Sequence, residues 1–344
     1  MYFGSCNGVF RRLDVRTGRI HWETNVRDGR AKQYFFHGDV FIAADRIVAS
    51  SDVDTTTGAE AGVHAFDLGT GRQLWKYSAG RGVPGAVVGS GSRVFAYTAT
   101  GDLIALNLAS GKPEWTHAVK AGPWENPAIL DHRVFAGSND GSVYAFESQT
   151  GRVQWHHKLA APITTSIAAT ASEIYAGTAD RKIYRLAPSN GDVRASVDVD
   201  SVLTPTSAPV GGKDAVLVLL ADKEANYRAI VSLDPTLARV RWRHTAPDRW
   251  TTSRVFATPR TVIVGSPSGE VTAYCAADGS VGWSHQLAKA PIRSIGGTDE
   301  TLLVGTPAGT LYAIRPPPAC MRSARLWIAK NPGSASTRRR PPTR

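Results

Sequence analysis

Four histidines recur at one position of a repeated pattern and are the first candidates for metal chemistry. Each stands two residues after a tryptophan: His117, His157, His244 and His285. Imidazole is a common metal ligand, so the series invites interpretation as a metal cluster. A repeating position, however, is carried by successive structural units, and here it falls on the outermost strand of each. We therefore expect these imidazoles to lie apart around a rim, beside the tryptophans, where they cannot share one ion.

An acidic segment is the second candidate for a metal site. Asp52, Asp54 and Glu60 fall in one long connection, and carboxylates at alternate positions suit a hard cation such as calcium. The segment lacks the loop pattern of a dedicated calcium site, and acidic loops are usually solvated. We therefore predict no bound metal here.

The remaining chemical motifs give little support for catalysis. Cys6, Cys275 and Cys320 are an odd number without metal-type spacing, so neither a zinc site nor a disulfide framework is predicted, and the compartment stays open. The chain also has no glycine-rich phosphate loop, nucleophile elbow or His-Glu-x-x-His helix. No catalytic residue is predicted.

The elements that position these residues follow from an internal repeat. Its marker is a tryptophan at the start of a strand, with Ala195 and Ser323 at the equivalent place in two copies; the markers are Trp22, Trp75, Trp115, Trp155, Trp242 and Trp283. A turn glycine precedes most markers: Gly18, Gly71, Gly111, Gly151, Gly191 and Gly279. The spacing of about 40 residues is typical of a solenoid or propeller. The glycine tolerates the positive φ of a turn, and a tryptophan can bury about 200 Å² against the next unit, so both roles are structural.

Each copy divides into four short strands. The clearest copy predicts strands at 126–130, 133–137, 142–146 and 153–158, which make one antiparallel propeller blade. The first copy lacks its first strand, and prolines replace the turn into the fourth strand of the last copy. We predict an all-β propeller of eight blades, with seven as the alternative. Either the C terminus completes the first blade or the true start lies upstream, because exposed edges must be covered.

Charge separates the repeats from the end of the chain. We assign residues 1–314 to the propeller and residues 315–344 to a basic tail rich in Pro, Ser and Arg, which we expect to be disordered. The formal charge is +11, but eight of the 40 basic residues lie in that tail, so the repeats hold 32 basic and 29 acidic residues. Specific nucleic-acid binding is therefore not predicted. No apolar run is long enough for a transmembrane segment, and no signal peptide is visible before the first strand.

One face of the propeller is a candidate partner-binding surface. The connections between blades open around the channel mouth, on the face opposite the glycine turns, and they carry aromatic and charged side chains of types enriched in interfaces. The candidates are Trp124, Glu125, Arg249, Trp250, Arg254 and Arg293. The alternative is that both tryptophans close the core between blades.

The pattern Ala-x-Asp/Asn-x-x-Thr-Gly-x-x-x-Trp at 65–75 and 105–115, and with Glu at 145–155, resembles the tryptophan-docking repeat of the quinoprotein (PQQ-like) propellers. That family includes quinone-dependent dehydrogenases and non-enzymatic propellers, and this chain is closest in style to the BamB-like members. The dehydrogenases are longer, hold calcium with Glu and Asn, use a catalytic Asp and in many cases have adjacent cysteines. This chain has no Cys-Cys pair and only two modest insertions.

The resemblance implies a non-catalytic, monomeric scaffold or adaptor that binds protein partners and needs no cofactor. It places the chain in the periplasm or cell envelope if the N terminus is truncated, and otherwise in the cytoplasm. The alternatives are a dehydrogenase dependent on PQQ and calcium, or its inactive remnant, and the ligand-sensing propeller of a bacterial signalling kinase.

Overall fold

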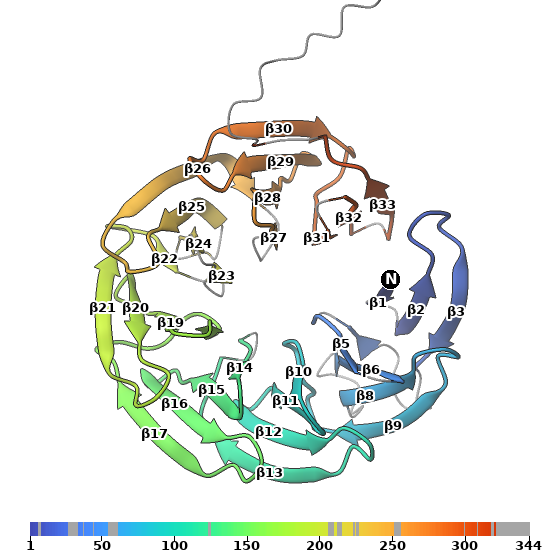
Figure 1. Ribbon diagram of the computed structural model, residues 1–344. Coiled ribbons are helices and arrows are strands. Elements are labelled where there is room, and N and C mark those ends of the chain that lie inside the picture. The colour runs from blue at the N-terminus through green and yellow to red at the C-terminus, as the bar shows by residue number, and fades with distance from the viewer. Residues whose placement is uncertain are drawn as a thin grey trace, which may run out of the picture.

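The strands form eight antiparallel blades arranged in a ring, with one additional two-stranded sheet (Figure 1). This computed structural model describes residues 1–5, 8–26, 34–36, 38–43, 45–53, 61–122, 125–205, 210–211, 215–222, 224, 227–250, 256–298, 300–307, 309–317 and 320. The described residues contain strands and turns but no helix. The prediction of an all-β propeller with eight blades is therefore confirmed.

The first four blades follow one another along the chain. Blade 1 contains β1 (Tyr2–Gly4), β2 (Val9–Leu13) and β3 (Ile20–Asn25). Blade 2 contains β5 (Phe41–Ala43), β6 (Arg46–Ser50), β8 (Gly62–Asp67) and β9 (Gln73–Ser78), and β4 (Tyr34–Phe35) pairs beside it with β7 (Asp52–Val53). Blade 3 contains β10 (Val88–Ser90), β11 (Arg93–Tyr97), β12 (Asp102–Asn107) and β13 (Pro113–Ala118). Blade 4 contains β14 (Ala128–Leu130), β15 (Arg133–Gly137), β16 (Ser142–Glu147) and β17 (Val153–Lys158).

The second half continues the same order. Blade 5 contains β18 (Ala168–Ala169), β19 (Ile174–Gly177), β20 (Lys182–Leu186) and β21 (Val193–Asp198). Blade 6 contains β22 (Thr204–Pro205), β23 (Val210–Gly211), β24 (Val216–Ala221), β25 (Tyr227–Leu233) and β26 (Val240–Trp250). Blade 7 contains β27 (Phe256–Ala257), β28 (Thr261–Gly265), β29 (Glu270–Cys275) and β30 (Val281–Gln286). Blade 8 contains β31 (Ser294–Gly297), β32 (Leu302–Gly305) and β33 (Leu311–Ile314).

The hydrophobic core lies between blades. Seven clusters of buried side chains join each blade from 1 to 7 to the blade that follows it. The two central strands of a blade are nearly fully buried in its cores, as in β8 and β24, whereas the outermost strands alternate exposed and half-buried residues. The ring is therefore a series of packed interfaces, with the first strand of each blade on the inside.

Five of the six marker tryptophans dock onto the glycine turn of the next blade. A Cβ added at Gly111, Gly151, Gly191 or Gly279 would lie 2.5 to 2.8 Å from the preceding blade's indole, and one at Gly71 would also meet Trp22. All five glycines have positive φ. The close approach and the backbone conformation therefore both require glycine.

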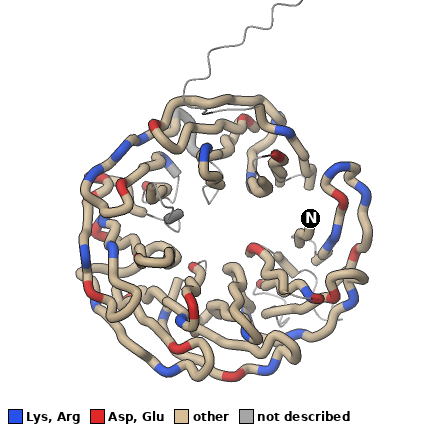
Figure 2. Tube along the Cα trace, in the orientation of Figure 1, with Lys and Arg blue, Asp and Glu red and all other residues tan. Residues whose placement is uncertain are grey.

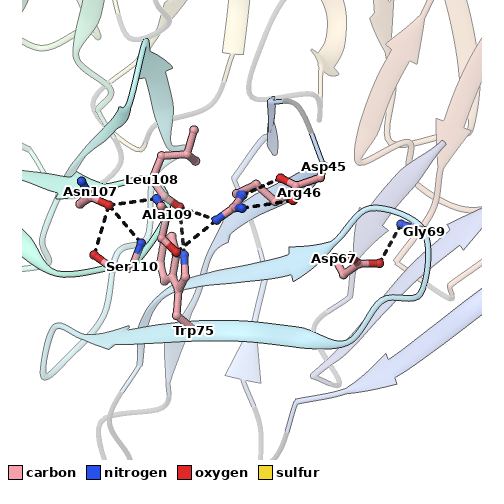
Figure 3. Close-up of polar contacts among 9 residues, drawn as sticks. All are labelled: Asp45, Arg46, Asp67, Gly69, Trp75, Asn107, Leu108, Ala109 and Ser110. Carbon is pink, nitrogen blue, oxygen red and sulfur yellow. Dashed lines mark hydrogen bonds and ion pairs between the residues drawn. The ribbon is translucent and has the colours of Figure 1, made fainter.

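Hydrogen bonds complete this docking (Figure 3). Trp75 Nε1 donates to the carbonyl of Leu108 at 3.0 Å, and Arg46 donates to the carbonyls of Leu108 and Ala109 at 3.2 and 3.1 Å. Trp22, Trp115, Trp155 and Trp242 make the equivalent bond to the next blade. In the turn of blade 2, the Asp67 carboxylate accepts hydrogen bonds from the Thr70 hydroxyl and from the backbone N–H groups of Thr70 and Gly69, which lower the pKa of that carboxyl.

The interface between blades 5 and 6 lacks both docking residues and replaces them with different ones. Ala195 stands at the tryptophan position and Ala238 at the glycine position, and Leu237, directly before Ala238, has a φ of 62°. The Leu237 side chain is buried beside Ala195 and fills the space of the missing ring. The phenol of Tyr175 donates to the carbonyl of Pro235 at 2.8 Å, and this carbonyl is the equivalent of the one that a tryptophan contacts elsewhere. Two side chains thus replace one indole.

Removing that phenol tests the replacement. Tyr175→Phe should lower the free energy of unfolding by about 1–2 kcal/mol, because the Pro235 carbonyl loses its donor inside the interface. Urea unfolding measures this change. Tyr144→Phe is the matched control, because Tyr144 stacks on Phe146 without a described hydrogen bond from its hydroxyl. Equal effects of the two substitutions would contradict the assignment.

Candidate functional site: the channel mouth

One repeat position forms a chain of hydrogen bonds between blades at the inner strands. Ala86, Asn126 and Ser166 lie 40 residues apart, each two residues before the first strand of its blade. The Ala86 N–H donates to Asn126 Oδ1 at 2.6 Å, and the Asn126 N–H donates to Ser166 Oγ at 2.8 Å. Each side chain therefore satisfies the backbone of the preceding blade, which fixes blades 3, 4 and 5 relative to one another at the channel.

Gly85 lets these segments approach closely. A Cβ at Gly85 would lie 2.7 Å from both Asn126 Oδ1 and the Glu125 carbonyl oxygen. The Gly85 carbonyl also accepts a 2.5 Å hydrogen bond from the buried Ser50 hydroxyl of blade 2. The chain of contacts thus extends over four consecutive blades.

Glu125 is the most perturbed acid of this mouth. Burial raises the pKa of its carboxyl to about 8, and a backbone hydrogen bond with Gly122 opposes that shift. Its Oε2 atom is buried and has no hydrogen-bond partner among the described residues. Burial, followed by the charge of Glu125, also raises the pKa of the Tyr97 phenol well above its usual range. At neutral pH both groups are predominantly protonated, so Glu125 can donate a hydrogen bond.

This shift predicts a pH dependence of stability. The folded pKa of Glu125 lies above its ordinary value of 4.5, so the folded protein retains a proton that the unfolded chain releases as the pH rises. The free energy of unfolding should therefore fall by roughly 2–4 kcal/mol between pH 4.5 and 8 from this group. Glu125→Gln should remove that decline in urea unfolding, while exposed Glu300→Gln should retain it. An unchanged decline in Glu125→Gln would contradict the assignment.

The other candidates of this face are separated or lie outside the described residues. Trp124 and Arg254 are not described. Arg249 and Trp250 end the extended strand β26, where the Trp250 backbone pairs with Tyr227. Arg293 is exposed ahead of β31, and Figure 1 shows β31 across the ring from β14, which follows Glu125. Arg249 and Trp250 are thus adjacent in one strand, whereas Glu125 and Arg293 belong to two other blades.

The histidines of the outer strand contact the turns of neighbouring blades. His117 Nε2 lies 2.6 Å from the Gly151 carbonyl oxygen, and His244 Nε2 contacts the Gly279 carbonyl in the same way. Both rings pack beside their tryptophans. These imidazoles therefore lie on separate interfaces, as their shared repeat position requires.

The acidic connection is only partly described. Asp52 lies in β7, whereas Asp54 and Glu60 fall outside the described residues. Within the described ranges, no three His, Cys, Asp or Glu side chains are grouped as metal ligands.

Sequence reasoning missed a disulfide and a buried polar pair. Cys275 and Cys320 are bonded across 45 residues, so the expectation of no disulfide was wrong. The equivalent of Cys275 in most other repeats is an acidic or amide residue, and only the fold brings Cys275 next to Cys320.

In blade 2, Ser51 Oγ lies 2.8 Å from His64 Nε2, and both residues are fully buried. His64 packs against Phe36 and Phe66, so substrates cannot reach this pair in the folded state.

Charges are distributed around the ring. Figure 2 shows Lys and Arg as well as Asp and Glu on successive blades, without one sign gathering over a single sector. This distribution over the described residues agrees with the near balance of charge in the repeats.

The fold and the docking contacts define a tryptophan-docking propeller of the PQQ-like class. The chain belongs to the family of the outer membrane protein assembly factor BamB, whose model matches residues 59–208 and 202–324. A search among curated proteins finds no significant match.

Solved structures share this architecture at low sequence identity. BamB from Moraxella catarrhalis is 18% identical, with a TM-score of 0.71 over 91% of this chain and 90% of its own. The WD40 domain of Sif2 is 12% identical, with a TM-score of 0.73 over 92% of both chains. A europium-containing methanol dehydrogenase is 12% identical, with a TM-score of 0.65 over 91% of this chain and 80% of its own. These similarities concern the fold alone.

Proposed function

We propose that this chain is a non-catalytic scaffold or adaptor that binds protein partners in the bacterial cell envelope. Its membership of the BamB family carries the proposal, because the family model spans most of the repeats. That family is named after a factor of outer membrane protein assembly. We therefore propose scaffolding as the general role, and the capture experiment below is designed to identify the partner.

The channel mouth is the surface that suits this role best. Its backbone is fixed by hydrogen bonds from one blade to the next, so binding requires little ordering of the main chain. The Glu125 carboxyl is predominantly neutral at pH 7, and its burial in an interface would avoid the large penalty of desolvating a charge. The connections on this face also differ most in sequence from one blade to the next. Variable loops on a rigid scaffold commonly determine which partner a protein binds.

We propose that the chain works without the PQQ and calcium of the dehydrogenase alternative. Calcium takes six to eight oxygen ligands and favours ionised carboxylates. Burial raises the pKa of the half-buried Glu125 at the mouth to about 8, which disfavours its ionised form at neutral pH. We therefore assign no cofactor to the proposed scaffold.

The disulfide supports the envelope assignment. Stable disulfides are common in oxidising compartments such as the periplasm and rare in the cytosol. The Cys275–Cys320 bond is therefore consistent with function outside the cytoplasm. Among the described residues, the structure contains no helix suited to crossing a membrane.

Partner capture from solubilised bacterial envelopes tests the binding face. The variant combines Trp124→Ala, Arg249→Ala and Trp250→Ala, and should lose the proteins that the intact chain retains. Its control places three substitutions on the exposed glycine-turn face, at Arg72, Lys112 and Arg152. The control should retain capture at the wild-type level, and loss in both variants or in neither would overturn the assigned face.

Titration with PQQ and calcium tests the non-catalytic assignment separately. The expected result is no saturable change in heat or in PQQ absorbance, and no oxidation of alcohols or sugars by a dye-linked assay. Saturable binding together with turnover would replace the scaffold proposal by a quinone-dependent dehydrogenase.

A further inference from the structure

Trp283, in β30 of blade 7, is the marker tryptophan that meets no glycine turn within the described ranges. At five other interfaces the indole donates to a carbonyl of the next blade, and one such pair is Trp75 and Leu108, 33 residues apart. The same separation leads from Trp283 to Pro316. Trp283 Nε1 has no hydrogen bond to Pro316 or to any other residue that the structure describes. This indole therefore retains a free N–H donor.

A cavity of about 550 Å³ lies beside Trp283, where the other markers meet a turn. Ile263 and Leu302 form its floor and belong to the buried core between blades 7 and 8. The turns that end at Thr261 and Thr301 form its rim, and residues 315–317 form one wall. Small-molecule sites typically have volumes of about 300–1,000 Å³, so this cavity has the size of a ligand site.

The cavity is lined by charged side chains that have no partners. Arg260 and Arg315 are both exposed, and neither guanidinium makes an ion pair or a hydrogen bond in the described part of the chain. Glu300 is the other charged residue of the lining, so two positive groups and one negative group leave a net charge of +1. A guanidinium presents its N–H donors as a planar fork that matches a carboxylate. The lining therefore favours an anionic ligand.

The lining is held in place before any ligand binds. Cys320 follows the proline wall and is bonded to Cys275 at the end of β29, so the wall is tethered to blade 7. On the rim, the hydroxyls of Thr258 and Thr261 lie 3.0 Å apart, and the Thr298 hydroxyl accepts from two backbone N–H groups of its own turn at 3.2 Å. Binding therefore requires little ordering of the backbone.

We propose that this cavity binds a small aromatic carboxylate. Its ring would lie against the Trp283 indole, which at the other interfaces is covered by a turn, and its carboxylate would accept from Arg260 and Arg315. The free indole N–H adds a third donor at the same place. Inorganic phosphate would use the guanidinium groups alone, because it has no flat apolar surface for the ring. The site lies at the turns between first and second strands, on the face opposite the channel mouth, and is separate from the proposed partner surface.

Isothermal titration calorimetry with 2-naphthoate tests the class of ligand. One equivalent should bind the full chain with a dissociation constant below about 1 mM. The neutral isostere 2-naphthamide should bind about tenfold more weakly or less, because it cannot form a charge-assisted pair with a guanidinium. Inorganic phosphate should also bind more weakly than 2-naphthoate. Absence of saturable 2-naphthoate binding, or equal affinity for the acid and the amide, would overturn the proposal.

Removing both guanidinium groups tests the location of the site. The double variant Arg260→Ala and Arg315→Ala should bind 2-naphthoate about tenfold more weakly or less, and should fold normally because both residues are exposed. Its matched control removes Arg72 and Arg152, two exposed arginines of other turns on the same face, and should retain the wild-type affinity. Wild-type affinity in the double variant, or an equal loss in the control, would contradict this site.

Two single variants separate the roles of the indole and of the charges. Trp283→Phe retains an aromatic surface and removes the donor, so its affinity for 2-naphthoate should fall about three- to tenfold. Glu300→Gln should increase that affinity about two- to fivefold, because it removes a charge of the same sign as the ligand. A lower affinity in Glu300→Gln would indicate a ligand with a positive group and contradict a simple anion. These titrations involve no protein partner, so their failure leaves the proposed scaffold function untouched.

Discussion

Trp115→Ala is expected to lower the free energy of unfolding by about 3–5 kcal/mol. The Trp115 ring lies over Gly151 and packs against Phe95 and Phe146 at centroid distances of 5.5 and 6.0 Å. Its indole also donates to the Ser148 carbonyl at 3.2 Å. Alanine removes the contacts and the donor together, and the rigid turn beneath cannot collapse into the space because its glycine is held at a φ of 72°.

Urea unfolding followed by circular dichroism measures this loss. Trp115→Phe is the matched variant: it retains most of the ring contacts and removes the indole donor, so its loss should be about 1–2 kcal/mol. A loss of less than about 1 kcal/mol for Trp115→Ala would mean that docking contributes little to stability.

Cys275→Ser is expected to lower the free energy of unfolding by about 2–4 kcal/mol. The bond closes a segment of 45 residues and ties the connection after β33 to the end of β29. Without it, the unfolded chain gains conformational freedom and the end of blade 8 loses its covalent anchor. The effect should appear as a lower melting temperature.

A reductant provides the control for this prediction. Dithiothreitol should destabilise the wild type by the same amount as the substitution and should leave Cys275→Ser unchanged. Cys320→Ser should match Cys275→Ser, and the double variant should add nothing. Free thiols at both positions in mass spectrometry of the untreated protein would contradict the bond.

The local repeat made most of the architecture predictable. The strands at 133–137 and 153–158 have the predicted bounds, because alternating side chains and Thr-Gly turns are encoded within a few residues. The first strand of that blade is shorter than predicted and begins at Ala128, since Asn126 bonds to the neighbouring blades instead of joining the sheet. The pairing of strands from the two termini stays a prediction: among the described residues β1 pairs with β2 and β33 with β32, and residues 321–344 lie outside the described ranges.

Contacts between distant segments were not predictable in the same way. Tyr175 occupies a position where neighbouring blades have Phe95 and Phe135, and nothing nearby in the sequence shows that its hydroxyl replaces an indole donor 20 residues away. Glu125 was selected as a charged residue of the face, but its raised pKa depends on burial that only the assembled blades produce. The disulfide has the same origin, because two blades must meet before its cysteines do.

The different residues at the interface between blades 5 and 6 restrict which blades can pack next to each other. In an array of interchangeable interfaces, a blade can be skipped during folding and the remaining units still fit together. If blade 4 packed against blade 6, the Trp155 ring would clash with Leu237, because the side chain of Leu237 fills the space that an indole occupies at other interfaces. If blade 5 met blade 7, Ala195 would leave the Gly279 turn uncovered. One interface that accepts only its own partner therefore penalises misassembly and sets the order of all eight blades.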